Sequence, residues 1–130
     1  MSDIRWTPSQ RLAIDTVDRS VLVSAGAGSG KTAVLAERCA HIVADLRPPC
    51  SVDRLLVVTF TDAAASEMRE RIARTLRKRL EDAPESAWLA RQLALVDSAH
   101  ISTLHSFCRR LLSRYFVQAE LDPQMPIIDP

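Results

Sequence analysis

The stretch AGAGSGKT, residues 25–32, decides the fold that we expect of this sequence. Glycine permits positive φ and a close backbone approach, and a loop that wraps a phosphate group needs both. The run Val21-Leu22-Val23 precedes the stretch and predicts a short strand, and apolar residues at helical spacing follow from Lys31 to about Leu46. All three glycines of the chain lie in this stretch: Gly26, Gly28 and Gly30. A strand, a glycine-rich loop and a helix in this order predict a P-loop.

A P-loop binds the phosphates of a nucleotide, here expected to be ATP with Mg²⁺. Backbone N–H groups and the N-terminus of the following helix converge on the anion. Lys31 is expected to reach the β- and γ-phosphates and Thr32 to ligate Mg²⁺, so these two residues are the catalytic candidates. The first position of the pattern is Ala25 rather than Gly. The expected phosphate-binding residues are Ala25, Gly26, Ala27, Gly28, Ser29, Gly30, Lys31 and Thr32.

Helix signals appear on both sides of this loop. Thr7-Pro8-Ser9-Gln10 predicts a helix start, with Thr7 as N-cap and Gln10 completing a capping box, and the helix is expected to run to about Arg19. Asp62 is expected to cap a second helix, whose apolar side holds Met68, Ile72, Leu76 and Leu80. Further helices are predicted at residues 86–96 and 105–121.

Two apolar runs between the helices predict strands. Residues 55–60 (LLVVTF) are continuous and rich in β-branched residues, as expected of a strand that is buried on both faces of a parallel sheet. Residues 101–104 predict a short strand, and Ile127-Ile128 is a possible third. Strands that alternate with helices predict an α/β fold with a parallel sheet flanked by helices. The loops after the strands, at 26–32, 59–62 and 104–106, should then lie at one edge, where ligands bind.

The length and composition of the chain limit its domain count and the cellular compartment that we expect for it. At 130 residues the chain is one domain at most, and its formal net charge of +1 gives no global attraction to nucleic acid. The polar N-terminus lacks the apolar core of a signal peptide, and no apolar run is long enough to span a membrane. The three cysteines have neither disulfide nor zinc-ligand spacing. We therefore expect a reduced, cytoplasmic protein.

Three further segments carry a resemblance to a known family. WTPSQRLAI (6–14), TFTDAAASEMRERI (59–72) and ISTLHSFCRRLL (101–112) closely resemble, in order, motifs of superfamily 1 DNA helicases of the UvrD/Rep type. The Rep and UvrD branch has Arg where this chain has Ala33, and the forms GSGKTAVL and TLHSFC are more similar to the helicase/nuclease branch, especially its A-subunit family (AddA). Asp62 stands where the family has Asn, which removes an amide donor.

The resemblance implies a RecA-like ATP-binding domain that acts on DNA, of which residues 1–130 are the N-terminal part. It implies that Gln10 recognises adenine, and that the parent protein works with a second helicase/nuclease subunit in double-strand break repair. Single-stranded and duplex-end DNA would be the substrate. The residues that it assigns to DNA are Thr59, Phe60, Thr61, Thr103 and His105.

Each assignment has a purely structural alternative. Gln10 can simply complete the capping box, Phe60 can be a core aromatic residue, and His105 can be a polar residue at a helix start. A basic cluster could follow DNA phosphates or could be a solvated helix face; it consists of Arg69, Arg71, Arg74, Arg77, Lys78 and Arg79. A small-molecule kinase, or a module that binds nucleic acid without nucleotide, would also contain some of these features.

The acidic residue that P-loop motors need at the end of another strand is not evident. Glu81-Asp82 is predicted on a helix, and Asp129 is flanked by Pro126 and Pro130. We therefore expect an incomplete fragment that binds ATP but does not turn it over.

Overall fold

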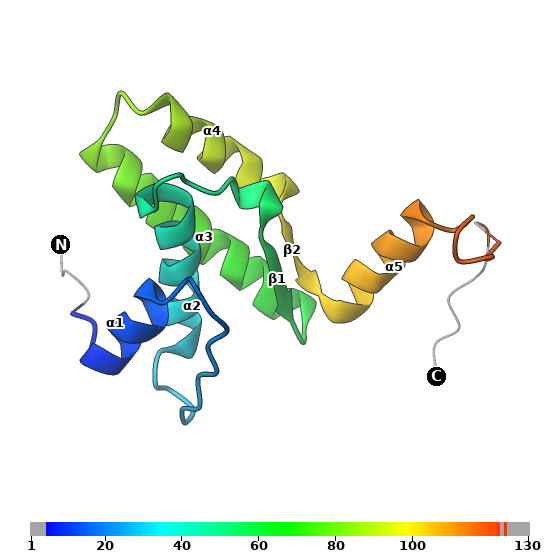
Figure 1. The fold of residues 1–130 in the computed structure, drawn as a ribbon, viewed down its shortest axis with the longest axis horizontal. Helices are drawn as coiled ribbons and strands as arrows, with labels where there is room; N and C mark the ends of the chain where they lie inside the picture. The colour runs from blue at the N-terminus through cyan, green and yellow to red at the C-terminus, as the bar shows by residue number, and fades with distance from the viewer. Residues whose placement is uncertain (1–4, 123, 125–130) are drawn as a thin grey trace.

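A computed structural model describes residues 5–122 and 124 of the chain. Figure 1 shows helices gathered around two short strands, with one further helix projecting from them. The chain is therefore an α/β protein with a small parallel sheet. Its main elements are α1 (Pro8–Asp15), α2 (Lys31–Ala40), β1 (Leu56–Thr59), α3 (Asp62–Asp82), α4 (Ala87–Leu95), β2 (His100–Thr103) and α5 (Leu104–Arg114). Short helical turns cover His41–Asp45, Val52–Arg54 and Val96–Ser98.

The first helix begins with the predicted capping box. The Thr7 hydroxyl accepts a hydrogen bond from the Gln10 backbone N–H at 3.3 Å, and Gln10 Oε1 accepts one from the Thr7 backbone N–H at 2.9 Å. The helix ends at Asp15 rather than near Arg19, because the backbone of Thr16 is already extended. The start of α1 was predictable from local chemistry, and its end was not.

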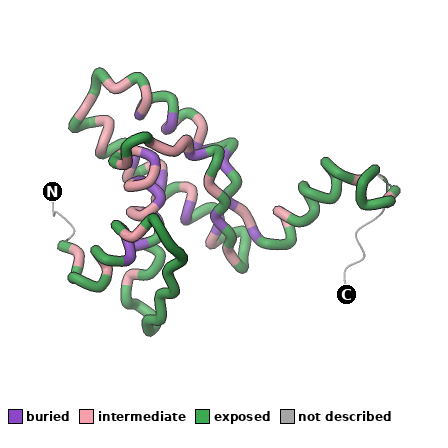
Figure 2. The backbone as a smooth tube through the Cα atoms, viewed as in Figure 1, coloured by how far each residue is buried: buried purple, intermediate pink, exposed green. Residues whose placement is uncertain are grey.

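The two strands pair in parallel and are covered on one face. Val57 pairs with Ile101 in the register, both side chains are buried, and α3 contacts both strands. The prediction that residues 55–60 are buried on both faces is wrong, since Leu56 is 49% and Val58 40% exposed. Side chains alternate between the faces of a strand, so the uncovered face of β1 remains open to solvent (Figure 2).

The predicted strand at Val21-Leu22-Val23 does not form. The sheet of the described residues consists of β1 and β2, so the segment has no strand to pair with. A strand is held by hydrogen bonds to its neighbours. The segment before the glycine-rich loop is therefore an exposed stretch, in which the Leu22 side chain is 96% exposed.

One large core and one small one hold the molecule together. The large core joins α2, α3, both strands and the turns that flank them; its fully buried centre includes Val43, Ile72, Leu76 and Ile101. The small core consists of Ala13, Ile14 and Val34, with Trp6 packed against it, and is the apolar contact that attaches α1. The apolar stripe predicted for α3 is confirmed for Met68, Ile72 and Leu76, which are buried, whereas Leu80 is half-buried.

Helix caps are partly as predicted. The cap of α3 is Thr61, whose hydroxyl accepts a hydrogen bond from the Ala64 backbone N–H at 3.1 Å; Asp62, the expected cap, is instead the first helical residue. Ser86 caps α4, in agreement with the helix predicted from residue 86.

The last helix lies apart from the core. α5 ends at Arg114, before the predicted end at residue 121, and contains no buried residue. It extends away from the other helices in Figure 1 and is almost entirely exposed in Figure 2. The possible strand at Ile127-Ile128 and the acidic candidate Asp129 lie outside the described residues. No helix within the described ranges is long and apolar enough to cross a membrane.

An ion-pair cluster at the end of α2 gives a pH-dependent prediction. Partial burial acts to raise the pKa of the Asp45 carboxyl, but the hydrogen bonds and charges of Arg79 and His41 outweigh it and lower that pKa. A carboxyl with a lowered pKa stabilises the fold above its unfolded pKa of about 3.9, and this stabilisation is lost as the pH falls through the folded value. We expect Asp45→Asn to lower the free energy of unfolding at pH 7 by about 1 kcal/mol or less.

Urea unfolding, followed by circular dichroism between pH 7 and pH 3, measures this effect. The difference between the parent chain and Asp45→Asn should shrink towards acid pH, whereas Asp53→Asn, at an exposed position, should have no effect. A difference that grows as the pH falls would contradict the assignment.

Candidate nucleotide site and nucleic-acid interface

The glycine-rich loop between residues 25 and 30 has two glycines in the left-handed region of the backbone. Gly28 and Gly30 have φ values of 74° and 83°, which favour glycine at both positions. A Cβ atom at Gly26 or Gly28 would meet nothing within 4 Å, so there is open space beside these two glycines. Gly30 is the N-cap of α2 and provides no side-chain cap. The first N–H groups of α2 are therefore available to an anion.

Lys31 lies against this loop. Its ammonium donates hydrogen bonds to the carbonyl oxygens of Ala25 and Gly26, both at 2.6 Å, and lies 3.5 Å from Ser29 Oγ. Ser29 Oγ in turn donates to the Gly26 carbonyl at 2.7 Å. The Thr32 side chain is exposed in the first turn of α2. The positive charge and the hydroxyl that the sequence assigns to phosphate and Mg²⁺ are thus both at the loop.

Gln10 connects α1 to the loop. Its Nε2 donates a hydrogen bond to the Ser29 carbonyl at 3.2 Å while its Oε1 accepts from the Thr7 N–H. An amide side chain has two N–H donors and two acceptor lone pairs, so one of each stays free. Adenine presents an acceptor at N7 beside a donor at N6, which is the pattern that a free amide donor and acceptor can pair with. Capping and base recognition are therefore compatible in one side chain.

The predicted DNA-contacting residues lie at the ends of the two strands. Thr59 and Thr103 are partners in the sheet register. Phe60, directly after β1, is 102% exposed, so the interpretation as a core aromatic residue is wrong. His105 is exposed in the first turn of α5. This position fits both a DNA contact and a polar residue at a helix start.

The threonines at these strand ends already have structural partners. Thr59 Oγ1 donates to the Thr61 carbonyl at 3.0 Å, and Thr61 caps α3. Thr103 is only 7% exposed and caps α5 by accepting a hydrogen bond from the Ser106 N–H at 3.2 Å. Phe60 and His105 are the two exposed members of this group that do not cap a helix.

The predicted residues form two groups rather than one continuous site. Gln10 and residues 25–32 are joined by the hydrogen bond to Ser29, and the residues after β1 and β2 are joined by the sheet. Both groups lie towards the lower side of Figure 1, and α2 and α3 pack against each other between them. The expectation that all three loops lie at one edge of the sheet is therefore wrong for the loop at 26–32, because no strand of the described sheet precedes it.

Three of the six residues of the basic cluster on α3 form ion pairs. Arg71 pairs with Glu67 at 2.7 Å and Arg74 with Glu70 at 2.8 Å, each one turn apart. Arg79 pairs with Glu37 at 2.6 Å and with Asp45 at 2.9 Å. Arg69 donates to the Ile101 carbonyl at 2.7 Å and so anchors α3 to β2. These contacts favour a solvated, ion-paired helix face over a phosphate-binding surface.

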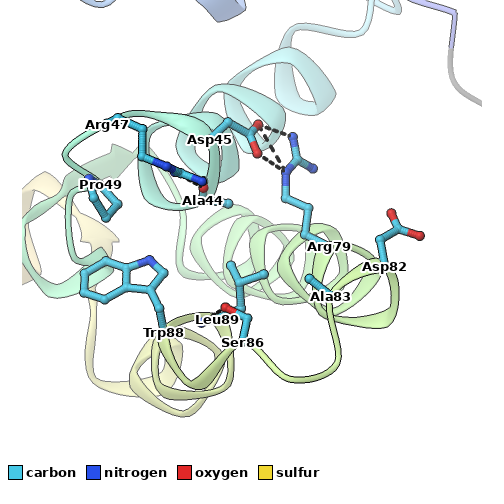
Figure 3. Close-up of a pocket in the computed structure, with 10 residues that line it drawn as sticks. All are labelled: Ala44, Asp45, Arg47, Pro49, Arg79, Asp82, Ala83, Ser86, Trp88 and Leu89. Atoms are coloured by element: carbon cyan, nitrogen blue, oxygen red, sulfur yellow. Dashed lines mark hydrogen bonds and ion pairs between the residues drawn. The ribbon is translucent and has the colours of Figure 1, made fainter.

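A hollow of about 380 Å³ lies elsewhere, between residues 44–49, which follow α2, and the junction of α3 with α4 (Figure 3). Trp88 and Arg47 line it together with Asp82, whose position at the end of α3 confirms that Glu81-Asp82 is on a helix. None of the predicted nucleotide or DNA residues lines the hollow. Within the described ranges no group of three or more metal-ligating side chains occurs.

Sequence reasoning missed one residue that contacts the helix carrying Gln10. Arg38, in the third turn of α2, donates hydrogen bonds from Nη1 to the carbonyl oxygens of Ala13, at 2.6 Å, and Thr16. Its partners are distant in the sequence and are backbone atoms, so no local pattern identifies the contact.

The chain was also compared with known proteins. The family model described as UvrD/REP helicase N-terminal domain matches residues 6–130. Relatives named as the A-subunit of an ATP-dependent helicase/nuclease are similar to 99% of this chain: that of Desulforamulus reducens is 54% identical, and those of Clostridium novyi and Desulforudis audaxviator are each 50% identical. The chain spans 10% of the length of each of these relatives.

Proposed function

The chain belongs to the UvrD/REP helicase N-terminal domain family, and from this we propose that it is the ATP-binding part of an ATP-dependent DNA helicase/nuclease subunit. The observation that carries the proposal is the glycine-rich loop, which has positive φ at Gly28 and Gly30 and to which Gln10 is hydrogen-bonded. The parent protein would use ATP hydrolysis to move along DNA in double-strand break repair and recombination. Because its substrate would be DNA, we propose a cytoplasmic location.

We propose that residues 1–130 form the N-terminal part of a RecA-like, P-loop ATP-binding domain. The open space at Gly26 and Gly28 leaves room for phosphate oxygens, and the N–H groups that start α2 supply donors. Lys31 would exchange its loop carbonyls for the β- and γ-phosphates. The exposed Thr32 hydroxyl suits a hard, oxygen-preferring cation, so Thr32 would hold Mg²⁺, which neutralises phosphate charge when it is bound. Gln10 would read adenine.

The strand ends would bind single-stranded DNA. A fully exposed ring such as Phe60 can stack on a base regardless of sequence, and the exposed His105 follows the paired strand, in the first turn of α5. Thr59, Thr61 and Thr103 would support this surface by fixing the two helix starts, and their backbone groups could contact phosphates. In the parent protein a duplex end of DNA and a second helicase/nuclease subunit would complete the assembly.

Equilibrium binding of labelled ATP and of a labelled oligonucleotide to this chain tests the proposal. We expect the chain to bind both ligands. A small-molecule kinase would bind ATP but no single-stranded DNA, and a nucleotide-free module would bind DNA with or without ATP and would show no ATP binding of its own. Either of those two patterns would overturn the proposal. A plain UvrD/Rep-type repair helicase would bind the same ligands, and nuclease activity of the parent protein separates it from the helicase/nuclease subunit.

Phe60→Ala is expected to weaken single-stranded DNA binding by about 1–3 kcal/mol, the usual value for one stacking ring. Because the side chain is fully exposed, its removal should leave the melting temperature unchanged. Fluorescence anisotropy with a short oligonucleotide measures the affinity. Leu12→Ala removes another exposed apolar side chain, on α1, and serves as the matched control. Equal DNA affinity for Phe60→Ala and the parent chain would exclude Phe60 from the interface.

A further inference from the structure

The helix that carries Gln10 has only a weak apolar attachment to the rest of the molecule. Its buried contacts are Ala13 and Ile14, which meet Val34 of α2 and are flanked by Trp6. The large core does not include any residue of α1. So small an apolar contact allows a helix to shift or rotate, and polar contacts must therefore contribute much of its orientation.

Arg38 supplies the polar contact at the end of α1. Its Nη1 donates to the Ala13 carbonyl at 2.6 Å and to the Thr16 carbonyl, and Thr16 is the C-cap of the helix. The last carbonyl groups of a helix have no partner within the helix, and a positive charge there interacts favourably with the helix dipole. The guanidinium is half-buried, so solvent screens these hydrogen bonds less than it would at the surface.

Both contacts of α1, the one to the glycine-rich loop and the one to Arg38, are made with α2 or with the loop directly before it. α2 begins at Lys31, directly after the P-loop, and carries Arg38 two turns later. α1 is thus tied to the loop by Gln10 and Ser29 and to the body of α2 by Arg38. If the Arg38 tie is lost, of these contacts the Gln10–Ser29 hydrogen bond and the small apolar contact still attach α1 to the loop and to α2.

We propose that Arg38 is a positioning residue for base selection: by fixing the end of α1 to α2, it holds the Gln10 amide where it can distinguish adenine from guanine. The inference rests on the proposed function of Gln10. Adenine offers Gln10 an acceptor beside a donor, whereas guanine presents two acceptors at the equivalent edge, one of which faces the amide oxygen. The triphosphate contacts depend on the P-loop and the start of α2, which Arg38 does not touch.

Competition binding against labelled ATP tests the proposal, with ATP, GTP and inorganic triphosphate as competitors. Arg38→Met keeps the aliphatic stem but removes the donors. It should lower the preference for ATP over GTP by about 3- to 10-fold, the effect of one or two hydrogen bonds, and leave the affinity for inorganic triphosphate unchanged. Arg38→Lys keeps the charge and a donor and should restore part of the preference. The control is Arg91→Ala, which changes an exposed arginine on α4. Its preference for ATP over GTP should equal that of the parent chain.

Two comparisons separate failure of this inference from failure of the proposed function. If Gln10→Ala leaves the preference for ATP over GTP unchanged, Gln10 does not read adenine and the proposed role of Gln10 is wrong. If Gln10→Ala abolishes the preference and Arg38→Met does not reduce it, only the inference about Arg38 is overturned. The double variant should lose little more of the preference for ATP over GTP than Gln10→Ala alone, since both substitutions act through the Gln10 amide.

Hydrogen exchange provides a readout that needs no nucleotide. In Arg38→Met the amides of α1 should exchange faster while those of α3 keep their rates, because α3 lies in the large core. Unchanged exchange in α1 would show that Arg38 does not hold the helix, and would overturn the proposal whatever the binding data show.

Discussion

Lys31→Ala is expected to lower the affinity of this chain for Mg²⁺–ATP by about 10- to 100-fold, with little change in melting temperature. Hydrogen bonds to charged groups contribute about 1.5–3 kcal/mol each, and the lysine supplies both charge and donors to the phosphates. In the structure the Lys31 side chain is exposed and bonds only to the loop itself, so its loss removes no core packing.

Lys78→Ala provides the matched control for this substitution. Lys31 and Lys78 are both exposed, but Lys78 is on α3 and far from the glycine-rich loop in the sequence. Isothermal calorimetry and a thermal melt of each variant give the comparison. Equal loss of ATP affinity in both variants would show a general effect of charge, and no loss in Lys31→Ala would exclude the P-loop as the phosphate site.

The second large effect concerns turnover. We expect phosphate release from ATP by this chain to equal that of Lys31→Ala, even when single-stranded DNA is present. Phosphoryl transfer needs a positioned water, a fully held metal and added positive charge in the transition state, and an arginine finger alone contributes about 10³–10⁵ in rate. The proposed P-loop would supply only the cradle, Lys31 and Thr32. Glu81-Asp82, the acidic pair considered from the sequence, ends a helix and is not at a strand end.

Steady-state phosphate release with and without an oligonucleotide measures this directly. A contaminating hydrolase would act equally on samples of both variants, so the Lys31→Ala chain sets the background. DNA-stimulated release that Lys31→Ala abolishes would show that the chain contains a complete catalytic site.

Local chemistry explains which parts of the fold could be predicted from the sequence. The capping box at Thr7 and Gln10, the α3 stripe of Met68, Ile72 and Leu76, and the α4 start at Ser86 all depend on residues close together in the chain. The strand at residues 21–23 and the two-sided burial of β1 depend instead on neighbours that this structure does not place beside them. Pairing and burial are properties of the whole sheet.

The candidate site also has features that the sequence could predict and features that it could not. The glycines and Lys31 could be identified because a phosphate loop needs those residue types in one short stretch. The exposure of Phe60 could not, because an aromatic residue after an apolar strand fits a core equally well. Arg38 gave no sequence signal, because its partners are carbonyl groups of a different helix.

Mapping the ATP site by NMR tests the central claim most directly. The ¹⁵N-labelled chain would be titrated with Mg²⁺–ATP while all assigned amides are followed. We predict that the largest shifts fall on residues 26–32 and on the side-chain amide of Gln10, while the amides around Trp88 and the hollow of Figure 3 stay in place. Shifts that centre on Trp88, Arg47 and Asp82, or no saturable shift in the glycine-rich loop, would contradict it.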